Sequence, residues 1–255
     1  MTDAIKKAPG GNRTAGNENT GVLKVLAIVF MIIDHAGAVF FPQYRDMRLI
    51  GRIAFPLFCW CLVVGCCYTS NIWKYALRIL VVGLISQPCF MLGLGHEWYQ
   101  LNVFATLLLG VLAIAGIQKK WRGSHIWAPI LAILAACAVQ MDYGWRGVAL
   151  ILMLYACREK KGAIAAVLTA FCLYWGYGTF KVTSFLGVPL ITSISFLPQA
   201  GGIFMALTQV QFWAILALPL MLIPMKRKSI LPKWIGYGAY PVHLLIFAAI
   251  KYWMM

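Results

Sequence analysis

Apolar residues fill most of the chain from Val22 onward, in runs separated by short polar or basic segments. A helix needs about 20 residues to cross a hydrocarbon core of about 30 Å, and continuous apolar runs are typical of helices, whereas the strands of a barrel alternate. The pattern predicts an all-α protein, a polytopic helical membrane bundle of about nine transmembrane helices, within a range of about eight to ten. The predicted spans are 22–41, 49–68, 73–93, 101–117, 125–141, 146–157, 163–176, 204–224 and 234–253.

Several of these spans are short. The runs 146–157 and 163–176 would rise only about 18–21 Å as helices, which is less than an undisturbed membrane core. Either these helices continue into their polar flanks, or the membrane is thinned around a water-filled cavity. A cavity of that kind suits an enzyme that admits a soluble cofactor to the middle of the bilayer.

Two segments depart from the pattern of apolar runs. Residues 1–20 are polar and rich in glycine and asparagine, which predicts a disordered cytoplasmic tail ahead of one membrane domain over residues 21–255. Residues 183–202 are apolar but interrupted by Pro189 and Pro198. We expect a re-entrant or interfacial element there, and a full crossing, which would give ten spans, is the alternative.

The net charge of +15 follows the membrane pattern and does not indicate nucleic-acid binding, because the cations fall in alternate segments between the spans. The positive-inside rule then places the N-terminus in the cytoplasm, and we expect a multi-pass protein of the bacterial inner membrane. Sixteen of the 22 basic residues fall on the cytoplasmic side in this arrangement: Lys6, Lys7, Arg13, Lys24, Lys74, Arg78, Lys119, Lys120, Arg122, Arg158, Lys160, Lys161, Lys226, Arg227, Lys228 and Lys233.

Asp34 and His35 lie side by side within the first apolar run. A charged side chain at the centre of a membrane helix costs roughly 2.5–3.5 kcal/mol on insertion scales, so the pair is a candidate for function. A neutral imidazole is the usual general base near pH 7, although a lone histidine also serves as a packing residue. Asp34 lies about 100° around the helix from His35 and is expected to pair with Arg52 near the start of the next span.

The remaining candidates lie at both ends of the predicted bundle. Asn102 and Asp142 begin helices at the outer end, where capping is as good an explanation as function. Tyr240 and His243 lie within the last span. On the cytoplasmic side, Lys24 and Arg78 are candidates to bind the phosphates of a nucleotide-bearing donor, the alternative being topology control alone.

Several motifs together resemble the TraX family of conjugal-transfer pilin acetylases, from about residue 21 to the end of the chain. The first span is also similar to the opening of integral-membrane acyltransferases, in which a basic residue precedes an intramembrane histidine. Many relatives have a segment similar to Ser-Glu-x-Pro-Phe-Asp. At the corresponding position this chain has Ser86-Gln87-Pro88-Cys89-Phe90-Met91. The matching motifs are Leu23-Lys24-Val25-Leu26-Ala27, Asp34-His35, Gly51-Arg52-Ile53-Ala54-Phe55-Pro56-Leu57-Phe58, Gln100-Leu101-Asn102-Val103-Phe104, Asp142-Tyr143-Gly144 and Tyr240-Pro241-Val242-His243.

The resemblance implies an N- or O-acetyltransferase that uses acetyl-CoA as donor. No metal is expected, because none of the four histidines makes an i, i+4 ligand pair. The resemblance places the family's histidine on His35, with Asp34, Arg52 and His243 as site companions. A pilin N-terminus, another peptide or a glycan are the possible acceptors, and nucleic acid is not expected as a partner. The rival hypothesis is a proton-coupled small-molecule transporter, in which Asp34, His35 and Arg52 form a relay.

Overall fold

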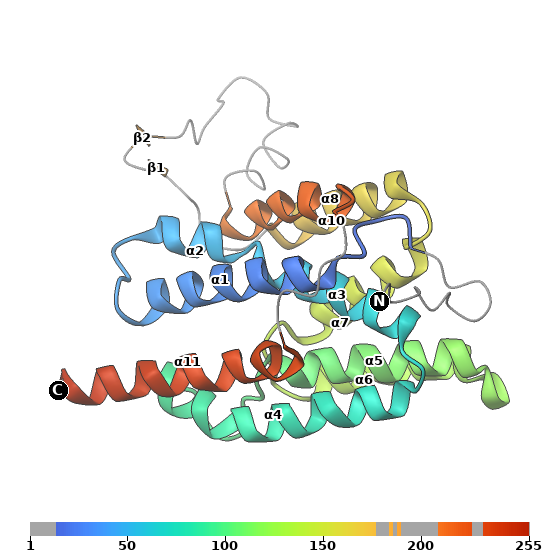
Figure 1. Cartoon of the computed structure of the whole chain (residues 1–255), viewed down its shortest axis with the longest axis horizontal. Helices are drawn as coiled ribbons and strands as arrows, with labels where there is room; N and C mark the ends of the chain where they lie inside the picture. Colours follow the sequence, from blue (N-terminus) through green and yellow to red (C-terminus); the bar gives the residue numbers. More distant parts are fainter. Residues whose placement is uncertain (1–13, 177–183, 186–187, 190–208, 226–231, 255) are drawn as a thin grey trace, which may run out of the picture.

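The computed structural model describes residues 14–176, 184–185, 188–189, 209–225 and 232–254 (Figure 1). Helices make up nearly all the regular structure of these residues, apart from the short antiparallel pair β1 (Ser184–Phe185) and β2 (Val188–Pro189). The α-helices are α1 (Thr20–Val39), α2 (Arg45–Gly51), α3 (Ala54–Tyr68), α4 (Ile72–Leu94), α5 (Val103–Lys119), α6 (Ser124–Ala138), α7 (Gly144–Cys157), α8 (Lys161–Gly176), α10 (Ala217–Leu222) and α11 (Lys233–Trp253), and the 3₁₀ helices are η1 (Trp121–Gly123) and η2 (Val210–Leu216).

Asparagine side chains begin three of the long helices. Asn19 accepts a hydrogen bond from the backbone N–H of Val22 at the start of α1, and Asn71 accepts two at the start of α4. Asn102 does the same for α5. Such caps satisfy backbone donors that a helix leaves without partners in its first turn. They fix where each apolar run becomes a helix.

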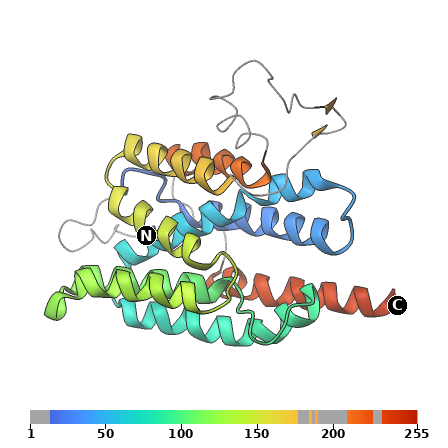
Figure 2. The same ribbon diagram turned by 180° about the vertical axis from the view of Figure 1, so that it is seen from behind.

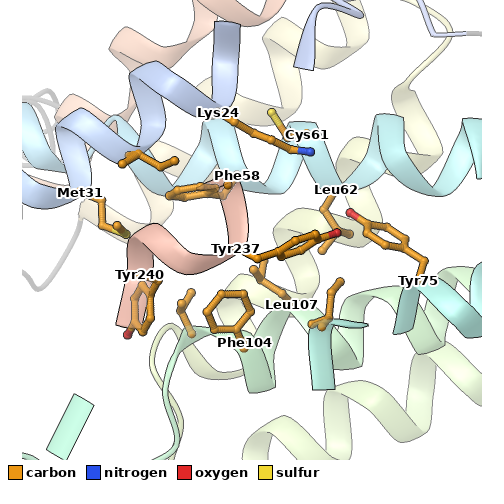
Figure 3. A pocket seen from close by; sticks show the side chains of 14 residues that line it. Lys24, Met31, Phe58, Cys61, Leu62, Tyr75, Phe104, Leu107, Tyr237 and Tyr240 are labelled. Atoms are coloured by element: carbon orange, nitrogen blue, oxygen red, sulfur yellow. The ribbon is translucent and has the colours of Figure 1, made fainter. Parts of the chain in front are cut away.

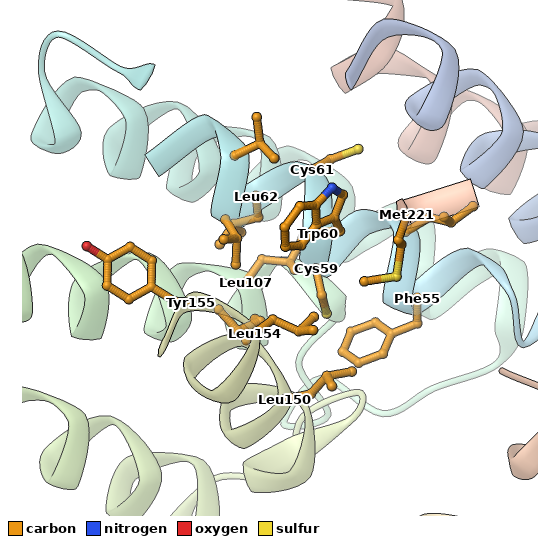
Figure 4. Close-up of a cluster of buried hydrophobic side chains, with 14 of the residues drawn as sticks. Phe55, Cys59, Trp60, Cys61, Leu62, Leu107, Leu150, Leu154, Tyr155 and Met221 are labelled. Atoms are coloured by element: carbon orange, nitrogen blue, oxygen red, sulfur yellow. The ribbon is translucent and has the colours of Figure 1, made fainter. Parts of the chain in front are cut away.

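Helix α3 is the centre of the bundle. It packs against α1, α5, α7 and α10, and Leu57 and Trp60 on it are fully buried. Figure 4 shows Trp60 among the buried side chains of this core. A helix that is apolar on all sides is buried, either in the core of a protein or in a membrane. Of the helices packed against α3, α1 and α5 run lengthwise along the molecule in both views (Figures 1 and 2).

In the part of the chain that the structure describes, three helical segments are long and apolar enough to cross a membrane: Thr20–Val39, Arg45–Tyr68 and Ile72–Leu94. The shorter apolar helices are Val103–Lys119, Gly144–Cys157, Lys161–Gly176 and Val210–Leu222. These lengths identify a helical membrane protein, but they do not establish the predicted set of nine spans. The segment 183–202 lies largely outside the described residues, which include only the four residues of β1 and β2 within it.

The predicted span 49–68 lies within the apolar segment Arg45–Tyr68, although its helical hydrogen bonding is interrupted between α2 and α3. The break falls at Arg52, and its cause is Pro56 in the first turn of α3. Proline has no N–H to donate to the carbonyl four residues earlier, and its ring crowds that carbonyl, here that of Arg52. The predicted span 204–224 also differs, since its described part begins as the 3₁₀ helix η2.

The predicted disordered tail is too long. Residues 1–13 lie outside the described residues, but residues 14–19 pack against the bundle. Asn17 is fully buried, its backbone N–H bonds to the carbonyl of Met221, and its own carbonyl accepts a hydrogen bond from the indole of Trp60 at 2.8 Å. Backbone pairing with distant elements therefore orders a segment that its composition alone predicts to be disordered.

The bundle has two chemically different ends. At the first, which we call the basic end, Gln118 on α5 bonds to the carbonyl of Cys66 on α3, and Ala15 bonds to the carbonyl of Arg158. At the second, the site end, lie Asp34, the α4–α5 connection and the α6–α7 connection. The predicted cytoplasmic cations whose side chains are described belong to helix termini at the basic end: Lys24, Lys74, Arg78, Lys119, Lys120, Arg122, Arg158, Lys160 and Lys161.

Candidate functional site

A buried cluster of charges joins α1 to α2 at the site end. The Asp34 carboxylate accepts hydrogen bonds from Arg52 at 2.6 Å and from Arg48 at 2.7 Å, and Arg48 also donates to the Asp34 backbone carbonyl. Arg52 reaches the amide oxygen of Gln211 as well, at 3.4 Å. The predicted pair of Asp34 and Arg52 is thus confirmed. Arg48 was missed, although it lies four residues before Arg52 and therefore on the same helix face.

Glycine permits the close approach of these two helices. A Cβ atom on Gly51 would lie 2.2 Å from the Cβ of Asp34, which no packing can accommodate without a shift. Gly37 has the same role one turn further along α1, where a Cβ would lie 2.7 Å from that of Met47. The glycine that opens the Gly-Arg-x-Ala-Phe-Pro motif therefore brings the two guanidinium groups within reach of Asp34.

His35 lies on a different face of α1, toward α11. Its Nδ1 atom lies 2.7 Å from Nε2 of His243, and the two rings are within 13° of parallel with their centroids 5.0 Å apart. When two nearly parallel rings have nitrogens 2.7 Å apart and centroids 5.0 Å apart, the two nitrogens lie between the centroids, so the imidazoles meet edge to edge. The arrangement is a hydrogen bond in the ring plane and not a face-to-face stack.

The backbone of α11 fixes the proton positions in this pair. His243 Nδ1 lies 2.8 Å from the carbonyl oxygen of Ala239, which can only accept a hydrogen bond. Nδ1 of His243 therefore carries a proton, and in the neutral ring its Nε2 is an acceptor. His35 must then donate from its Nδ1, which leaves the lone pair on His35 Nε2. This is the tautomer that a general base requires.

Tyr240 completes the environment of the histidines. It is buried, and its ring meets those of His35 and His243 edge-on, with centroids 6.1 Å and 5.5 Å apart. The structure thus brings His35, Tyr240 and His243 together on α1 and α11. It places Asp34 and Arg52 in a separate cluster between α1 and α2, on a different face of α1.

The two predicted phosphate-binding residues share a cavity at the basic end. Lys24 and Arg78 both line a space of about 490 Å³ between α1, α3, α4 and the start of α11, which we call the vestibule. Tyr237 and Tyr75 line the vestibule and also a narrower apolar channel of about 80 Å³. The channel runs from Lys24 to Tyr240 between Phe58 and Phe104 (Figure 3). The vestibule and the channel are therefore adjacent, with Lys24 and Arg78 at one end and the tyrosine beside His35 at the other.

Asn102 has a structural role in addition to its helix cap. Its amide nitrogen donates to the Gly83 carbonyl at 2.8 Å and to the Gln87 amide oxygen at 2.9 Å. Gln87 in turn donates to the Gln100 carbonyl at 2.7 Å. The glutamine that occupies the position of the glutamate in the related motif thus holds α4 to the start of α5. These contacts are the structural alternative that the sequence left open for Asn102.

Asp142 and Tyr143 lie in the connection between α6 and α7. Burial raises the pKa of the Asp142 carboxyl to about 6, opposed by the nearby Arg52. Tyr143 stacks on Phe55, with ring centroids 3.5 Å apart, and burial raises the pKa of its phenol as well. The sequence indicated the position of Asp142 at a helix start but gave no indication that its surroundings raise the pKa of its carboxyl.

These features define a helical membrane protein with an oriented histidine pair, a buried cluster of charges and a cavity system open at its basic end. The family model described as TraX protein matches residues 19–251, and the chain belongs to the TraX family.

The curated relatives match over shorter stretches. A probable fimbrial assembly protein FimC, serogroup H1, of Dichelobacter nodosus is 30% identical over 164 residues, which covers 58% of this chain and 67% of that protein. An uncharacterized protein of Rickettsia prowazekii is 27% identical, and Protein TraX of Escherichia coli is 28% identical over 118 residues. The matches cover 56% and 47% of those two proteins, so the chain spans about half of their length. No solved structure matches the chain.

Proposed function

We propose that the protein is a membrane-embedded acetyltransferase that moves an acetyl group from acetyl-CoA to an amine or hydroxyl acceptor. The observation that carries the proposal is the histidine pair, in which the Ala239 carbonyl and His243 leave the lone pair of His35 on Nε2. The cavities that lead to it from Lys24 and Arg78 supply a route for the donor. The same motifs led to this hypothesis from the sequence.

In this mechanism His35 acts on the acceptor. As the acceptor nitrogen or oxygen bonds to the acetyl carbon, Nε2 of His35 takes the proton that the acceptor loses, and His243 holds the other ring nitrogen through its hydrogen bond. The C–S bond of the thioester breaks, and the thiolate of CoA leaves with the proton that His35 returns. The acetyl group and one proton have then exchanged partners, with no net change in charge.

The donor would enter from the basic end. Lys24 and Arg78 would hold its phosphates in the vestibule. Hydrogen bonds from a cationic side chain to a phosphate oxygen are stronger than hydrogen bonds between neutral groups. The channel between Phe58 and Phe104 is narrow and apolar, which suits an extended arm and excludes water from the thioester. Tyr240 closes the channel beside the histidine pair.

The charge cluster would support the site without touching the reacting atoms. Asp34 and Arg52 fix α1 against α2, and His35 follows Asp34 directly in the chain. A rigid α1 at this point holds the His35 ring within hydrogen-bond reach of His243. In this role Asp34 and Arg52 position α1 and take no direct part in the reaction.

The relatives suggest the biological setting. One is a fimbrial assembly protein by name, and the family is that of TraX. We infer a role in pilus or fimbrial assembly, with a pilin N-terminus, another peptide or a glycan as acceptor. The protein would act in the bacterial inner membrane with about nine crossings and its basic end in the cytoplasm.

The orientation can be tested by cysteine labelling. In a background without native cysteines, Lys119→Cys at the exposed end of α5 should react with a membrane-impermeant maleimide only after the cells are opened. Gln43→Cys, exposed at the opposite end, should react in intact spheroplasts. The reverse pattern would place the site end in the cytoplasm and contradict the proposed route of the donor.

We expect acetyl-CoA to bind in the vestibule and to stabilise the folded protein. A ligand that binds only the folded state raises stability by about 2.7 kcal/mol at a hundredfold excess over its Kd, so acetyl-CoA should raise the melting temperature in detergent. Arg78→Ala should reduce this shift, whereas Lys119→Ala, outside the cavity, should leave it unchanged. Equal shifts in both variants would contradict phosphate binding in the vestibule.

The direct test of the function is acetyl transfer by the purified protein. The protein is incubated with labelled acetyl-CoA and either an alanine-terminated peptide or a sugar, and label transfer is compared with free CoA release. Stoichiometric transfer to either acceptor supports the proposal. If the protein shows no acetyl transfer and no thermal shift at millimolar acetyl-CoA, the proposal is overturned and the transporter hypothesis is favoured.

A further inference from the structure

A second cavity lies at the site end, away from the vestibule. It has a volume of about 300 Å³ and lies between the α4–α5 connection and the α6–α7 connection. We call it the outer cavity. Its lining combines an aromatic wall, polar groups and apolar side chains, namely Phe90, His96, Gln100, Leu101, Val139, Gln140, Met141 and Asp142. No lysine or arginine is among these lining residues.

One wall of the outer cavity is built by local contacts. His96 stacks on Phe90, with ring centroids 4.3 Å apart, and its Nδ1 atom lies 3.0 Å from the Gln100 amide oxygen. That oxygen also accepts a hydrogen bond from the backbone N–H of Glu97. Because an amide oxygen only accepts, His96 donates from Nδ1, and its Nε2 is left as an acceptor when the ring is neutral.

Asp142 supplies the charge on the opposite wall. Its backbone is held by a hydrogen bond to the Leu101 carbonyl and by the Thr106 hydroxyl, which donates to the Asp142 carbonyl. Within the described part of the chain, its carboxylate makes no hydrogen bond or ion pair. Asp34 engages both arginines of the charge cluster at short distances. Asp142 is partly exposed and therefore presents a carboxylate to the outer cavity with its acceptor atoms uncommitted.

One buried cluster of side chains links the outer cavity to the channel. Phe90, which lines the outer cavity and whose ring stacks on His96, belongs to the same cluster as Tyr240 and Leu244 on α11. Tyr240 also lines the channel from the vestibule, and its hydroxyl is turned away from Lys24 (Figure 3). Because the Tyr240 ring meets those of His35 and His243, the outer cavity, the channel and the histidine pair all contact this one cluster.

We propose that the outer cavity is the acceptor site and that it binds a primary amine in its protonated form, with Asp142 as counter-ion. The bound ammonium releases one proton to solvent, and the neutral amine then attacks the thioester and gives its second proton to His35. The available groups are a carboxylate, an amide oxygen and an imidazole acceptor, all of which suit a hydrogen-bond donor of positive charge. The apolar residues Leu101, Val139 and Met141 would contact the uncharged segment that follows the amine. This inference rests on the proposed acetyltransferase function for its purpose, but the binding chemistry stands on the cavity alone.

The charge preference of the outer cavity can be measured without any acetyl transfer. Gln140→Cys is introduced into the full-length protein after the exposed Cys137 and the partly exposed Cys157 are changed to serine. The rates of reaction with a cationic and an anionic methanethiosulfonate reagent are compared with those of Gln43→Cys. Local potentials raise counter-ion encounter rates by about tenfold or more, so the cationic preference should be about tenfold larger at Gln140→Cys.

Matched variants assign the preference to one carboxylate. Asp142→Asn should abolish it, whereas Glu97→Gln, an exposed acidic residue in the adjacent loop, should leave most of it. An unchanged preference in Asp142→Asn would overturn the proposal, as would equal rates for the two reagents. The result does not depend on catalysis, so it remains informative if acetyl transfer itself is not found.

The KM for the acceptor, compared with the binding of acetyl-CoA, distinguishes a loss of acceptor binding from a loss of overall activity. If the protein transfers acetyl groups, Asp142→Asn should raise the KM for an amine acceptor by about tenfold, the loss of one charge-assisted contact. Acetyl-CoA binding should be unchanged, because the vestibule lies at the other end. An unchanged KM for the amine would overturn the assignment of this cavity to the acceptor.

Discussion

His35→Ala should lower acetyl transfer by about 10²–10⁴-fold, the usual contribution of a positioned proton acceptor, while acetyl-CoA still binds. The reason is geometric, because the only lone pair that the histidine pair leaves free is on His35 Nε2. The donor contacts lie at Lys24 and Arg78, in the vestibule. Turnover and the thermal shift by acetyl-CoA, measured on the same preparation, would separate the two effects.

The other histidines of the chain provide the comparison. His125→Ala removes an exposed imidazole at the basic end and should leave transfer unchanged. His243→Ala should reduce transfer less than His35→Ala, because it removes the partner that orients the base and not the base itself. Well-folded His35→Ala protein with near-normal transfer would refute the mechanism and make His243 the better candidate.

Asp34→Ala should destabilise the protein by about 3–5 kcal/mol, the usual cost of breaking a buried ion pair by removing one partner. The variant would leave Arg48 and Arg52 close together with no carboxylate between them, and the Arg52 side chain is only 14% exposed. The melting temperature in detergent and the yield of monodisperse protein would measure the loss. Glu97→Ala, which removes an exposed carboxylate at the same end, should have little effect.

A graded series distinguishes the ion cluster from other causes. Arg48→Gln should cost less than Arg52→Gln, since the Arg48 side chain is 29% exposed and retains water when its partner is removed. Replacing Asp34, Arg48 and Arg52 together by apolar residues of similar volume should recover much of the stability, because no charge is then left unpaired. Normal melting of Asp34→Ala would show that the cluster does not hold α1 to α2.

Local sequence is enough to identify some of these features. Long apolar runs show that the chain is a helical membrane protein, because an apolar segment of that length needs no tertiary information to prefer lipid over water. The alternation of basic segments likewise placed Lys24 and Arg78 at one end, where the vestibule lies. Asp34 and Arg52 were expected to pair because two buried charges on neighbouring segments are stable only together.

Other features depend on contacts that hydropathy cannot predict. Pro56 cannot donate a hydrogen bond to the Arg52 carbonyl, which causes the break before α3. The segment before α1 is ordered by hydrogen bonds to Trp60 and Met221. Arg48 was not singled out because an arginine near a helix end has an ordinary explanation as a surface residue. The outer cavity arises where two loops meet, and loop geometry leaves no periodic signal.

Hydropathy and charge along the chain therefore establish the class of protein, its apolar segments, its basic end and the identity of most chemically unusual residues. Family resemblance adds His243 as a companion of His35. The edge-to-edge contact of the two rings, the tautomer that the Ala239 carbonyl selects and the separate cluster of Asp34 emerge only in the folded bundle. A helix fixes the direction of each side chain relative to its own axis, whereas the rotation and crossing of helices whose contacting residues are 208 positions apart are set by packing of the whole bundle.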